Sequence, residues 1–399
     1  MIITITPRKL QGNINIIPSK SQAHRYLICA AFSDCETQII CPAVNQDIEA
    51  TVACLNALGA DIQRTETGYD VIPIKAVPTK ATLSCGESGS TLRFMLPIAG
   101  ALGVFTDFIL EGRLSQRPLS PLWEEMERMG CQLSWVNKNT LRCAGKLQHG
   151  VYNIDGSVSS QFITGLLFAL SLIPGESTLN ITGMIESKPY IDMTLEALTT
   201  FGVMIDNTKL KGQFPFHSPK IAKIEGDWSN GAFFLAARSL GNNINVDGLN
   251  ALSKQGDRAV QAILNAMANF IEIDAKDIPD LVPILSVVAA ASKGAKFCNI
   301  RRLRLKESDR VQTVMDMLQA FGIHSASDEN TLTVYPGIFQ GCTVDSANDH
   351  RIAMSAGIAA TIANGPVTIL NAQCVAKSYP AFWEEYRQLG GTYEQYLRK

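Results

Sequence analysis

The amino-acid sequence predicts an α/β protein of two domains, built from six repeated strand–helix units with three units in each domain. Three observations support this fold class. Amphipathic helices recur along the chain, an apolar helix precedes each of them, and strand-like segments lie between the helices. The 399 residues, of which 46% are hydrophobic, are sufficient for two separate cores.

The amphipathic helices are identified by hydrophobic residues that recur every three or four positions. Each helix ends at a glycine or an asparagine that suits a left-handed C-terminal cap, and a short strand follows. The closing residues are Gly59, Gly130, Gly202, Asn269, Gly322 and Gly390. The repeats are spaced by roughly 50 to 70 residues, which indicates repetition of one structural unit.

The helix before each amphipathic helix is apolar on nearly all sides and rich in alanine and glycine. Such a helix is expected to be buried, and its small residues allow close helix approach. These segments are SQAHRYLICAAFS, GSTLRFMLPIAGALG, SSQFITGLLFALSL, SNGAFFLAARSLG, PDLVPILSVVAAAS and DHRIAMSAGIAATIA. Strand signals such as ATLSC, DFILEG, TLNITG, NINVDG and VTILNA separate them. We therefore expect buried helices surrounded by mixed sheets.

A division into three plus three repeats sets the domain boundaries. Domain I is predicted to combine residues 1–17 with residues 226–399, and domain II to span residues 18–225. The chain would cross between the domains near 18 and near 223–226, where we expect a hinge. The first residues, MIITITPRKLQ, resemble a strand, and we expect it to pair with the C-terminal half.

Composition argues against several classes of function. A net charge of −2 provides no basic field for nucleic acid. The N-terminal residues lack the pattern of a signal peptide, and the longest apolar runs fall short of the roughly 20 residues that span a bilayer. The ten cysteines and five histidines are dispersed, which is typical of reduced thiols in a cytoplasmic protein without a metal site.

Charged residues stand at the N-terminal ends of the apolar helices. Serine, aspartate and asparagine at these ends are ordinary N-caps. Capping does not explain the cations in the same turns, which are Lys20, Arg25, Arg93, His350 and Arg351. A cation opposes the positive end of a helix dipole, whereas phosphate and carboxylate are stabilised there. We therefore expect these ends to form an anion-binding cleft between the domains.

Further basic residues precede other helices. Arg117 in SQRPL, Lys188 in SKPYIDM and Lys377 in VAKSYP are each compatible with a solvated surface charge, but their shared placement favours anion binding. The stretch RRLRLKESDR, residues 301–310, has the highest charge density. Its first part alternates leucine with charge, which predicts the end of a strand, and Ser308 is predicted to cap the following helix.

Nine stretches carry a resemblance to a known family. They are PSKSQAHR, GESGSTLR, QRPLSPL, DGSVSSQF, ESKPYIDMT, IPDLVP, RLKESDR, NDHRIAM and AKSYPAFW. In these stretches, which cover nearly the whole chain in order, the sequence resembles the EPSP synthases, the 3-phosphoshikimate 1-carboxyvinyltransferase family. The combination of KESDR, DGSVSSQF and NDHR is highly specific.

The resemblance implies a two-domain inverse α/β barrel, the enolpyruvate transferase fold. It implies transfer of the carboxyvinyl group of phosphoenolpyruvate to the 5-hydroxyl of shikimate 3-phosphate through a tetrahedral intermediate, with release of phosphate. This reaction belongs to the shikimate pathway, which leads to chorismate and the aromatic amino acids. The family uses neither a metal nor an organic cofactor, and we expect a monomer with two small anionic substrates.

The resemblance also implies roles for individual residues. The implied ligands of shikimate 3-phosphate are Lys20, Ser21, Arg25, Ser159, Ser160, Gln161, Ser187, Tyr190, Asp280 and Lys306. The implied ligands of phosphoenolpyruvate, and of the inhibitor glyphosate, are Lys20, Gly89, Arg117, Gln161, Arg310, His350, Arg351 and Lys377. Asp280 would deprotonate the hydroxyl and Glu307 would protonate the methylene carbon, with Lys306 and Lys20 between the substrates.

These residue types fit the chemistry independently of the resemblance. Two polyanionic substrates need cations and N–H donors before they can bind together. Arginine forks match carboxylate and phosphate groups, and addition of a hydroxyl across an enol double bond requires a base for oxygen and an acid for carbon. The tetrahedral intermediate gains from charges that are already fixed in place.

Three residues depart from the family pattern, and one of them is Ser90, which stands where many members have threonine. Glu87 stands where many members have asparagine, and Arg302 stands where some have an asparagine that touches the shikimate phosphate, so neither is assigned to the site. Replacement of the glycine at the position of Gly89 by alanine is associated with glyphosate tolerance in the family. With glycine there, we expect a glyphosate-sensitive enzyme.

Three alternatives are considered, and the most remote is a nucleotide-end-processing enzyme built from related repeats, which the lack of a basic surface and of the expected motifs disfavours. The sister enzyme, UDP-N-acetylglucosamine enolpyruvyl transferase, usually carries a cysteine five residues before an Arg-Pro pair, and here that position is Gly112. A non-catalytic anion-binding protein on the same fold would not require both Asp280 and Glu307, and both are present. Phosphate release with both substrates distinguishes an enzyme from such a protein.

Overall fold

The computed structural model describes residues 1–206, 209–212 and 215–396. The chain divides into two compact units, which we call the terminal unit (Met1–Ile17 with Gly226–Lys399) and the central unit (Pro18–Glu225). Each unit has its own hydrophobic core. None of the described helices is long and apolar enough to cross a membrane.

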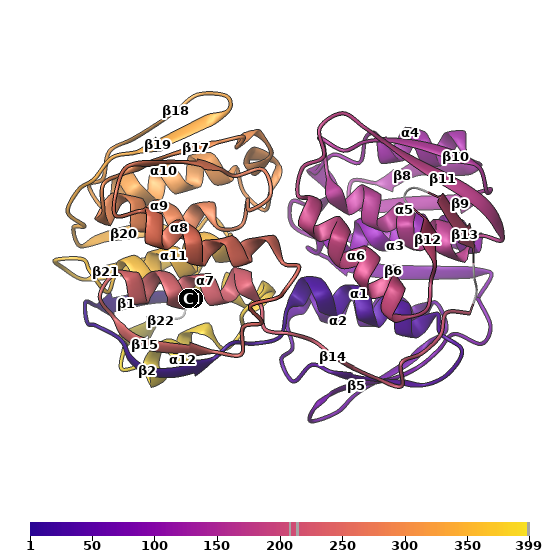
Figure 1. Cartoon of the computed structure of the whole chain (residues 1–399), viewed down its shortest axis with the longest axis horizontal. Helices are drawn as coiled ribbons and strands as arrows, with labels where there is room; N and C mark the ends of the chain where they lie inside the picture. The colour runs from indigo at the N-terminus through magenta and orange to yellow at the C-terminus, as the bar shows by residue number, and fades with distance from the viewer. Residues whose placement is uncertain (207–208, 213–214, 397–399) are drawn as a thin grey trace. The chain divides into compact units, whose positions relative to one another are not determined.

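One repeated arrangement accounts for most elements of both units (Figure 1). A strand leads into a buried helix, a second strand runs parallel to the first, and an outer helix leads into two further strands. The second repeat of the central unit consists of β6 (Lys80–Gly86), α3 (Gly89–Leu102), β7 (Phe105–Leu110), α4 (Leu122–Arg128), β8 (Cys131–Asn137) and β9 (Thr140–Gly145). Its sheet has the order β6-β7-β9-β8, with β6 and β7 parallel and the other pairs antiparallel.

The other repeats of the central unit follow the same plan. The third repeat consists of β10 (Val151–Asp155), α5 (Ser160–Leu172), β11 (Gly175–Thr182), α6 (Lys188–Thr200), β12 (Ile205–Asp206) and β13 (Lys209–Gly212). The first repeat consists of α1 (Lys20–Ala31), β3 (Thr37–Ile40), α2 (Gln46–Ala57), β4 (Asp61–Arg64), β5 (Gly68–Ile72) and β14 (Ile221–Lys223). Here the last strand of the unit, β14, takes the leading position beside β3.

The terminal unit contains two complete repeats. The fifth repeat of the chain consists of β16 (Ile271–Asp274), α9 (Val282–Ala291), β17 (Ala295–Cys298), α10 (Arg310–Ala320), β18 (Ser325–Ser327) and β19 (Thr331–Val334). The sixth consists of β20 (Cys342–Asp345), α11 (His350–Ala359), β21 (Val367–Leu370), α12 (Phe382–Gln388) and β22 (Thr392–Tyr396), and β1 (Ile2–Thr6) completes its sheet. The N-terminal strand thus pairs with the C-terminal half, which confirms the sequence prediction.

The fourth repeat differs from the predicted pattern. It consists of β2 (Gln11–Asn15), α7 (Trp228–Ser239), β15 (Asn243–Asp247), the 3-10 helix η2 (Gly256–Ala259) and α8 (Val260–Ala266). Within the described residues, its sheet contains two strands, β15 and β2, which run parallel to each other. The chain runs from α8 directly into β16 of the next sheet, so no segment is left to form a hairpin.

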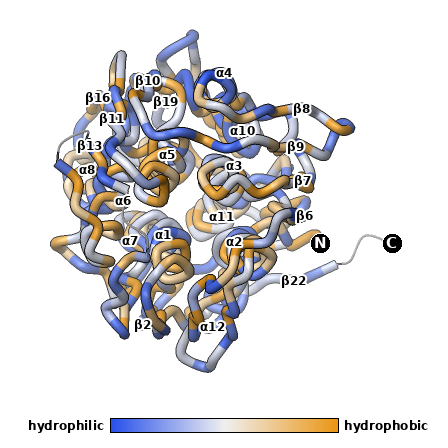
Figure 2. The backbone as a smooth tube through the Cα atoms, turned by 90° about the vertical axis from the view of Figure 1, so that its right-hand side faces the viewer, coloured by the Kyte–Doolittle hydropathy of each residue, from blue (hydrophilic) through white to orange (hydrophobic). Residues whose placement is uncertain are grey.

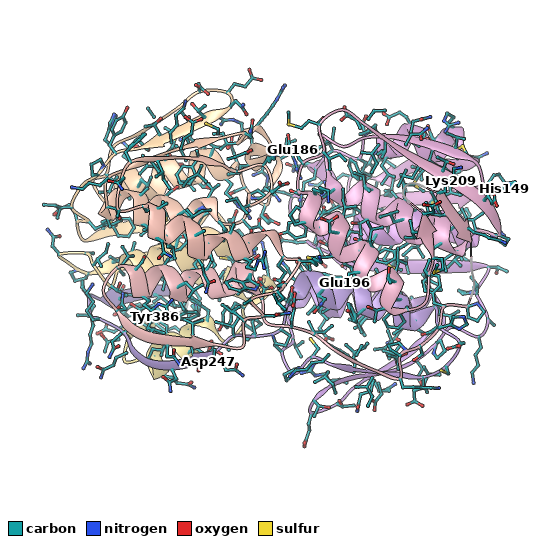
Figure 3. All side chains as sticks on the ribbon, viewed as in Figure 1. His149, Glu186, Glu196, Lys209, Asp247 and Tyr386 are labelled. Atoms are coloured by element: carbon teal, nitrogen blue, oxygen red, sulfur yellow. The ribbon has the colours of Figure 1, made fainter. Side chains whose placement is uncertain are left out.

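The buried helices form the cores. In the central unit, α3 and α5 pack side by side, and both are largely hydrophobic in Figure 2. A side chain at Gly165 would collide with the carbonyl oxygen of Arg93, so glycine is needed for this close approach. In the terminal unit, Tyr386 of α12 lies within the core, whereas Asp247 at the end of β15 is exposed (Figure 3).

The N-terminal ends of the buried helices are capped as predicted, with one exception. Side-chain oxygens of the capping residues accept backbone N–H groups at Ser19, Ser88, Ser159, Asp227 and Asp349. Helix α9 follows Leu281 and has no side-chain cap.

The predicted C-terminal ends of the amphipathic helices are of two kinds. All five closing glycines have positive φ. Asn269 instead forms an ordinary turn, in which its N–H donates to the Ala266 carbonyl at 3.2 Å.

The charged stretch at residues 301–310 is not a strand end. Strand β17 ends at Cys298, and Arg301–Leu305 forms the 3-10 helix η3, in which Leu303 is buried while Leu305 is exposed. The cap of α10 is Asp309, whose carboxylate accepts the N–H of Gln312, and not Ser308. The alternation of leucine with charge was misleading because a 3-10 turn that buries one leucine produces a similar pattern.

Candidate active site

An ionic cluster in the terminal unit is centred on Arg310, the first residue of α10. The Arg310 side chain is only 1% exposed. Its Nη1 donates to Oδ1 of Asp280 at 2.7 Å, and its Nη2 donates to Oε2 of Glu307 at 2.6 Å. Its Nε donates to Oδ2 of Asp349 at 3.0 Å. One buried guanidinium therefore holds both carboxyl groups that the resemblance assigns to proton transfer.

Burial alone would lower the pKa of Arg310, but the charges of Asp349, Glu307 and Asp280 outweigh burial and raise it. The guanidinium is therefore a permanent cation. Removing one partner from such a buried cluster leaves a charge without compensation, which typically costs 3–5 kcal/mol. The cluster is thus stable only while its partners stay together.

Asp280 is also held by a second arginine. Nη2 of Arg351 lies 3.4 Å from Oδ2 of Asp280, and Nη1 of Arg351 donates to the Ser229 carbonyl at 3.0 Å. Arg351 is the second residue of α11, and its backbone N–H is capped by Asp349 at 2.9 Å. The carboxylate that caps α11 therefore also contacts Arg310, which links the two arginines.

Lys306 lies between η3 and α10, with its Nζ 3.8 Å from Oδ1 of Asp280. Burial lowers the pKa of Lys306 to about 8; Arg310 and Arg302 also lower it, against the opposing effect of Asp280 and Glu307. An amine with this pKa exchanges its proton near neutral pH, which suits a group that takes part in acid–base chemistry.

His350 and Lys377 lie close to the same helix end. His350 is the first residue of α11 and is 3% exposed. Nζ of Lys377 donates to the carbonyl of Asn348 at 2.9 Å, just before that helix. The terminal unit thus places all six of its predicted substrate-binding residues around the start of α10 and α11, with Glu307 beside them.

The central unit fixes Arg25 with acceptors from three helices. Its Nε donates to Oγ1 of Thr194 at 2.9 Å, and its Nη2 donates to the Tyr190 carbonyl at 2.9 Å and to Oγ1 of Thr164 at 3.4 Å. Its Nη1 donates to the Ser21 carbonyl at 2.6 Å. Burial lowers the pKa of Arg25 to about 10, which leaves the group charged at neutral pH.

The side chain of Gln161, in α5, forms hydrogen bonds with residues near the N-terminal end of α3. Its Oε1 accepts from Nη1 of Arg93 at 2.7 Å, and its Nε2 donates to Oγ of Ser90 at 2.9 Å. Gly89 lies beside the same groups. A Cβ at this position would be 2.5 Å from Nη1 of Arg117 and 3.1 Å from Nη1 of Arg93. The first residue of α3 is therefore surrounded by two guanidinium groups.

The remaining residues predicted for this unit lie at helix starts. Nζ of Lys20, the first residue of α1, forms an ion pair with Asp47 at 2.9 Å. Ser159 caps α5 and Ser160 begins it, so both stand at its N-terminus. Ser187 precedes α6 in a left-handed conformation with φ of 55°.

Several contacts were not anticipated from sequence. Asp349, Asp47 and Thr194 hold predicted site residues but look like ordinary capping or surface residues in the sequence. The signal for Asp349 was its place in the motif NDHR. By contrast, Lys188 pairs with Asp192 at 2.8 Å on the surface, and its side chain is 61% exposed.

The two unassigned residues differ in their surroundings. The carboxyl group of Glu87 lies against Gly112 in the loop after β7, where a Cβ on Gly112 would be 2.6 Å from Cδ of Glu87. Arg302 lies in η3 near Lys306 and contributes to the lowered pKa of that lysine. Within the described ranges, no group of three or more His, Cys, Asp or Glu side chains is arranged to hold a metal ion.

Comparisons with known proteins agree with these features. The family model of EPSP synthase (3-phosphoshikimate 1-carboxyvinyltransferase) matches residues 5–386. A 3-phosphoshikimate 1-carboxyvinyltransferase of Clostridium acetobutylicum is 40% identical over 416 residues, covering 98% of this chain and 97% of the relative. One from Clostridium perfringens is 39% identical over 419 residues, covering 98% of each.

Solved structures confirm the predicted fold. An EPSP synthase from Acinetobacter baumannii superposes with a TM-score of 0.79 at 23% identity, covering 99% of this chain and 100% of that chain. The enolpyruvyl transferase NikO from Streptomyces tendae superposes with a TM-score of 0.76 at 18% identity, covering 98% of each. Given the family match over most of its length and the curated relatives, the chain belongs to the EPSP synthase (3-phosphoshikimate 1-carboxyvinyltransferase) family.

Proposed function

We propose that the Arg310 cluster performs the proton transfers of the family's reaction in this chain. That reaction moves the carboxyvinyl group of phosphoenolpyruvate to the 5-hydroxyl of shikimate 3-phosphate and releases phosphate. The observation that carries the proposal is that Arg310 holds the carboxyl groups of Asp280 and Glu307 at 2.7 and 2.6 Å. A base and an acid are thereby fixed by one cation.

In the first step, Asp280 accepts the proton of the 5-hydroxyl, with Lys306 beside it at 3.8 Å. The hydroxyl oxygen attacks C2 of phosphoenolpyruvate, and the electrons of the double bond take a proton at C3 from Glu307, which enters this step in its protonated form. This gives a tetrahedral intermediate with a methyl group. In the second step, Glu307 takes a proton back from that methyl group, the C–O bond to phosphate breaks, and the leaving phosphate takes up the proton that Asp280 accepted. The double bond is thereby restored.

The cations of the terminal unit suit phosphoenolpyruvate. Arg351 and Lys377 lie near the N-terminus of α11, where backbone N–H groups and the helix dipole also favour anions. Arginine binds carboxylate and phosphate in two-pronged geometry. We assign Arg310, His350, Arg351 and Lys377 to this substrate, together with Gly89 and Arg117 of the central unit.

The central unit supplies groups suited to shikimate 3-phosphate. Arg25 is already fixed by its protein acceptors, so it presents its charge without reordering. Ser159 and Ser160 stand at the start of α5, and Ser187 stands at the start of α6. We assign these residues to the phosphate and ring of the acceptor, together with Lys20, Ser21, Gln161 and Tyr190, and Lys20 is shared with phosphoenolpyruvate.

The sister activity on UDP-N-acetylglucosamine is not favoured. Gly112 has φ of 54°, and a Cβ there would lie 2.6 Å from Cδ of Glu87, so a cysteine at this position is disfavoured. A coupled assay that measures phosphate release distinguishes the acceptors. Release with shikimate 3-phosphate and none with UDP-N-acetylglucosamine is expected, and the reverse result would overturn the proposal.

Three further features are part of the proposal. The two domains move about hinges near residues 18 and 223–226 when substrates bind, the protein is monomeric, and it is cytoplasmic. Free thiols at all ten cysteines fit a reducing compartment. Small-angle scattering tests the hinge motion, and identical curves with and without shikimate 3-phosphate plus glyphosate would count against it.

A further inference from the structure

The segment before α8 is clamped onto the first turn of α7. Nε2 of Gln255 donates to the Gly226 carbonyl at 2.8 Å, and its Oε1 accepts from the backbone N–H of Trp228 at 3.0 Å. This clamp places Asp257, in η2, beside Ser229 of α7. In the sequence, Asp257 looks like the ordinary acidic start of an amphipathic helix.

Asp257 is buried, with 2% of its surface exposed. Its Oδ2 accepts a hydrogen bond from Oγ of Ser229. Its Oδ1 is also buried, and no hydrogen-bond partner for it exists among the described residues. A buried carboxylate with so little hydrogen bonding is costly in its ionised form, so burial favours the protonated form.

Asp257 is connected to the Arg310 cluster through Ser229 and Arg351. The Ser229 carbonyl accepts from Nη1 of Arg351 at 3.0 Å, and Nη2 of the same arginine lies 3.4 Å from Asp280. Nε of Arg351 is buried and, within the part of the chain that the structure describes, has no acceptor. The Arg351 guanidinium therefore has few acceptors for its N–H groups. An additional negative charge nearby would interact strongly with its positive charge.

The charged groups that face Asp257 come from three elements. Burial, followed by repulsion from Asp280 before α9 and from Asp227 at the start of α7, raises its pKa to about 7. The hydrogen bond from Ser229 and the charge of Arg351 in α11 act in the opposite direction. A free aspartate titrates near 3.9, so this group changes charge in the range where enzymes work.

We propose that Asp257 is a positioning residue of the transfer reaction. While Asp257 is protonated, the positive charge of Arg351 remains available to Asp280 and to phosphoenolpyruvate. When Asp257 loses its proton, the added negative charge competes for Arg351 and repels the anionic substrate. The affinity for phosphoenolpyruvate therefore falls as Asp257 ionises. This inference rests on the proposed function, since it assigns Arg351 to that substrate.

The kinetic test compares the wild type with Asp257→Asn, which imitates the protonated carboxyl group. In the wild type, the KM for phosphoenolpyruvate is expected to rise about tenfold from pH 6 to pH 8.5, while kcat changes less. In Asp257→Asn the KM is expected to rise much less over the same range. Ionisation of the substrate phosphate and of Lys306, whose pKa is about 8, is common to both proteins and cancels in the comparison. Parallel KM profiles for the two proteins would overturn the inference.

A second measurement does not depend on the transfer activity of the protein. Aspartate labelled with ¹³C at the side-chain carboxyl is followed by NMR against pH, and the signal that disappears in Asp257→Asn belongs to Asp257. A midpoint near pH 7 supports the inference, and a midpoint near 4 overturns it even if the enzyme is active. Absence of transfer activity with a midpoint near 7 would instead contradict the proposed function.

Ser229→Ala provides a second variant in case Asp257→Asn does not fold. The Ser229 hydroxyl lowers the pKa of Asp257, so its removal is expected to move the midpoint of the KM profile to higher pH. The carbonyl that binds Arg351 belongs to the backbone and is retained. A purely structural role would leave the midpoint unchanged, and that result would overturn the inference.

Discussion

Oδ2 of Asp349 lies 3.0 Å from Nε of Arg310, and Oδ1 of the same carboxylate accepts the backbone N–H of Arg351 at 2.9 Å. One fully buried carboxylate therefore fixes both the start of α11 and the guanidinium that holds Asp280 and Glu307. The geometry of the proton-transfer groups depends on a residue that is not itself assigned to chemistry.

Substitution of Asp349 by asparagine should impair both activity and stability. Asparagine retains an oxygen that can cap α11 but removes a negative charge from a buried cation. We expect kcat/KM to fall about 100-fold and the free energy of unfolding to fall by about 3 kcal/mol. Phosphate release and urea unfolding measure the two effects.

Asp309→Asn is the matched control for this change. Asp309 caps α10 by the same kind of bond, but its side chain is 41% exposed and pairs with Arg304. We expect a loss of about 1 kcal/mol or less and unchanged kcat/KM. Equal effects of the two substitutions would show that Asp349 acts only as a helix cap.

Glu307→Gln should remove the acid that protonates carbon while keeping the shape of the side chain. We expect kcat to fall about 1000-fold, with little change in the KM for either substrate. Glu329→Gln is the control, because Glu329 is exposed and pairs with Arg301 on the surface. An active Glu307→Gln enzyme would exclude this residue as the acid.

Lys306→Met should make the protein more stable and inactive. Burial lowers the pKa of Lys306 to about 8, against about 10.4 for a free lysine. Below pH 8 the folded protein bears the cost of a buried charge, and removing this charge should raise the free energy of unfolding by about 1 kcal/mol.

The pH dependence of this effect has a definite sign. Between about pH 8 and pH 10, the unfolded chain binds the lysine proton and the folded chain does not, so the stability of the wild type rises with pH. The difference in free energy of unfolding between Lys306→Met and the wild type should therefore become smaller over this range. Chemical unfolding at pH 7 and pH 9.5 measures it, and a constant difference would contradict the assigned pKa.

Gly89→Ala should weaken phosphoenolpyruvate binding and glyphosate inhibition together. A Cβ at this position would lie 2.5 Å from Nη1 of Arg117, so the guanidinium must shift. We expect the KM for phosphoenolpyruvate to rise about tenfold, in keeping with loss of one well-placed charge interaction. The wild type should be inhibited by millimolar glyphosate with phosphoenolpyruvate near its KM, and full activity there would contradict the prediction.

Gly100→Ala tests whether this effect is specific to the start of α3. Gly100 lies in the same helix, where a Cβ would lie 2.8 Å from Sγ of Cys131 and 3.1 Å from Cγ of Leu147. Overpacking of this kind typically costs 1–3 kcal/mol. We expect lower stability and an unchanged KM for phosphoenolpyruvate.

The sequence predicts the repeated elements because their periodicity is strong. Apolar helices such as α3 and α5 cannot be surface helices, and the strands between them have clear signals. Short elements were harder to predict. The turn at Arg301–Leu305 and the two-stranded sheet of the fourth repeat depend on how the chain connects neighbouring sheets, which local patterns do not encode.

The residues assigned by resemblance lie together within each unit, but the residues that hold them were not predicted. Asp349 and Thr194 act through contacts distant in sequence, such as the bond between Thr194 and Arg25. The motif NDHR was the one sequence feature that marked Asp349, whereas a mid-helix threonine has no sequence feature that separates it from many others. Asp257 was missed for the same reason.

The most direct test of the proposed chemistry is transfer in D2O with both substrates, followed by NMR of the carboxyvinyl product. Because Glu307 is proposed to protonate C3 and then remove a proton from the resulting methyl group, the wild type should place deuterium in the vinyl methylene group. Glu307→Gln should form almost no product. Product with an undeuterated methylene group, or no product from the wild type, would contradict the account.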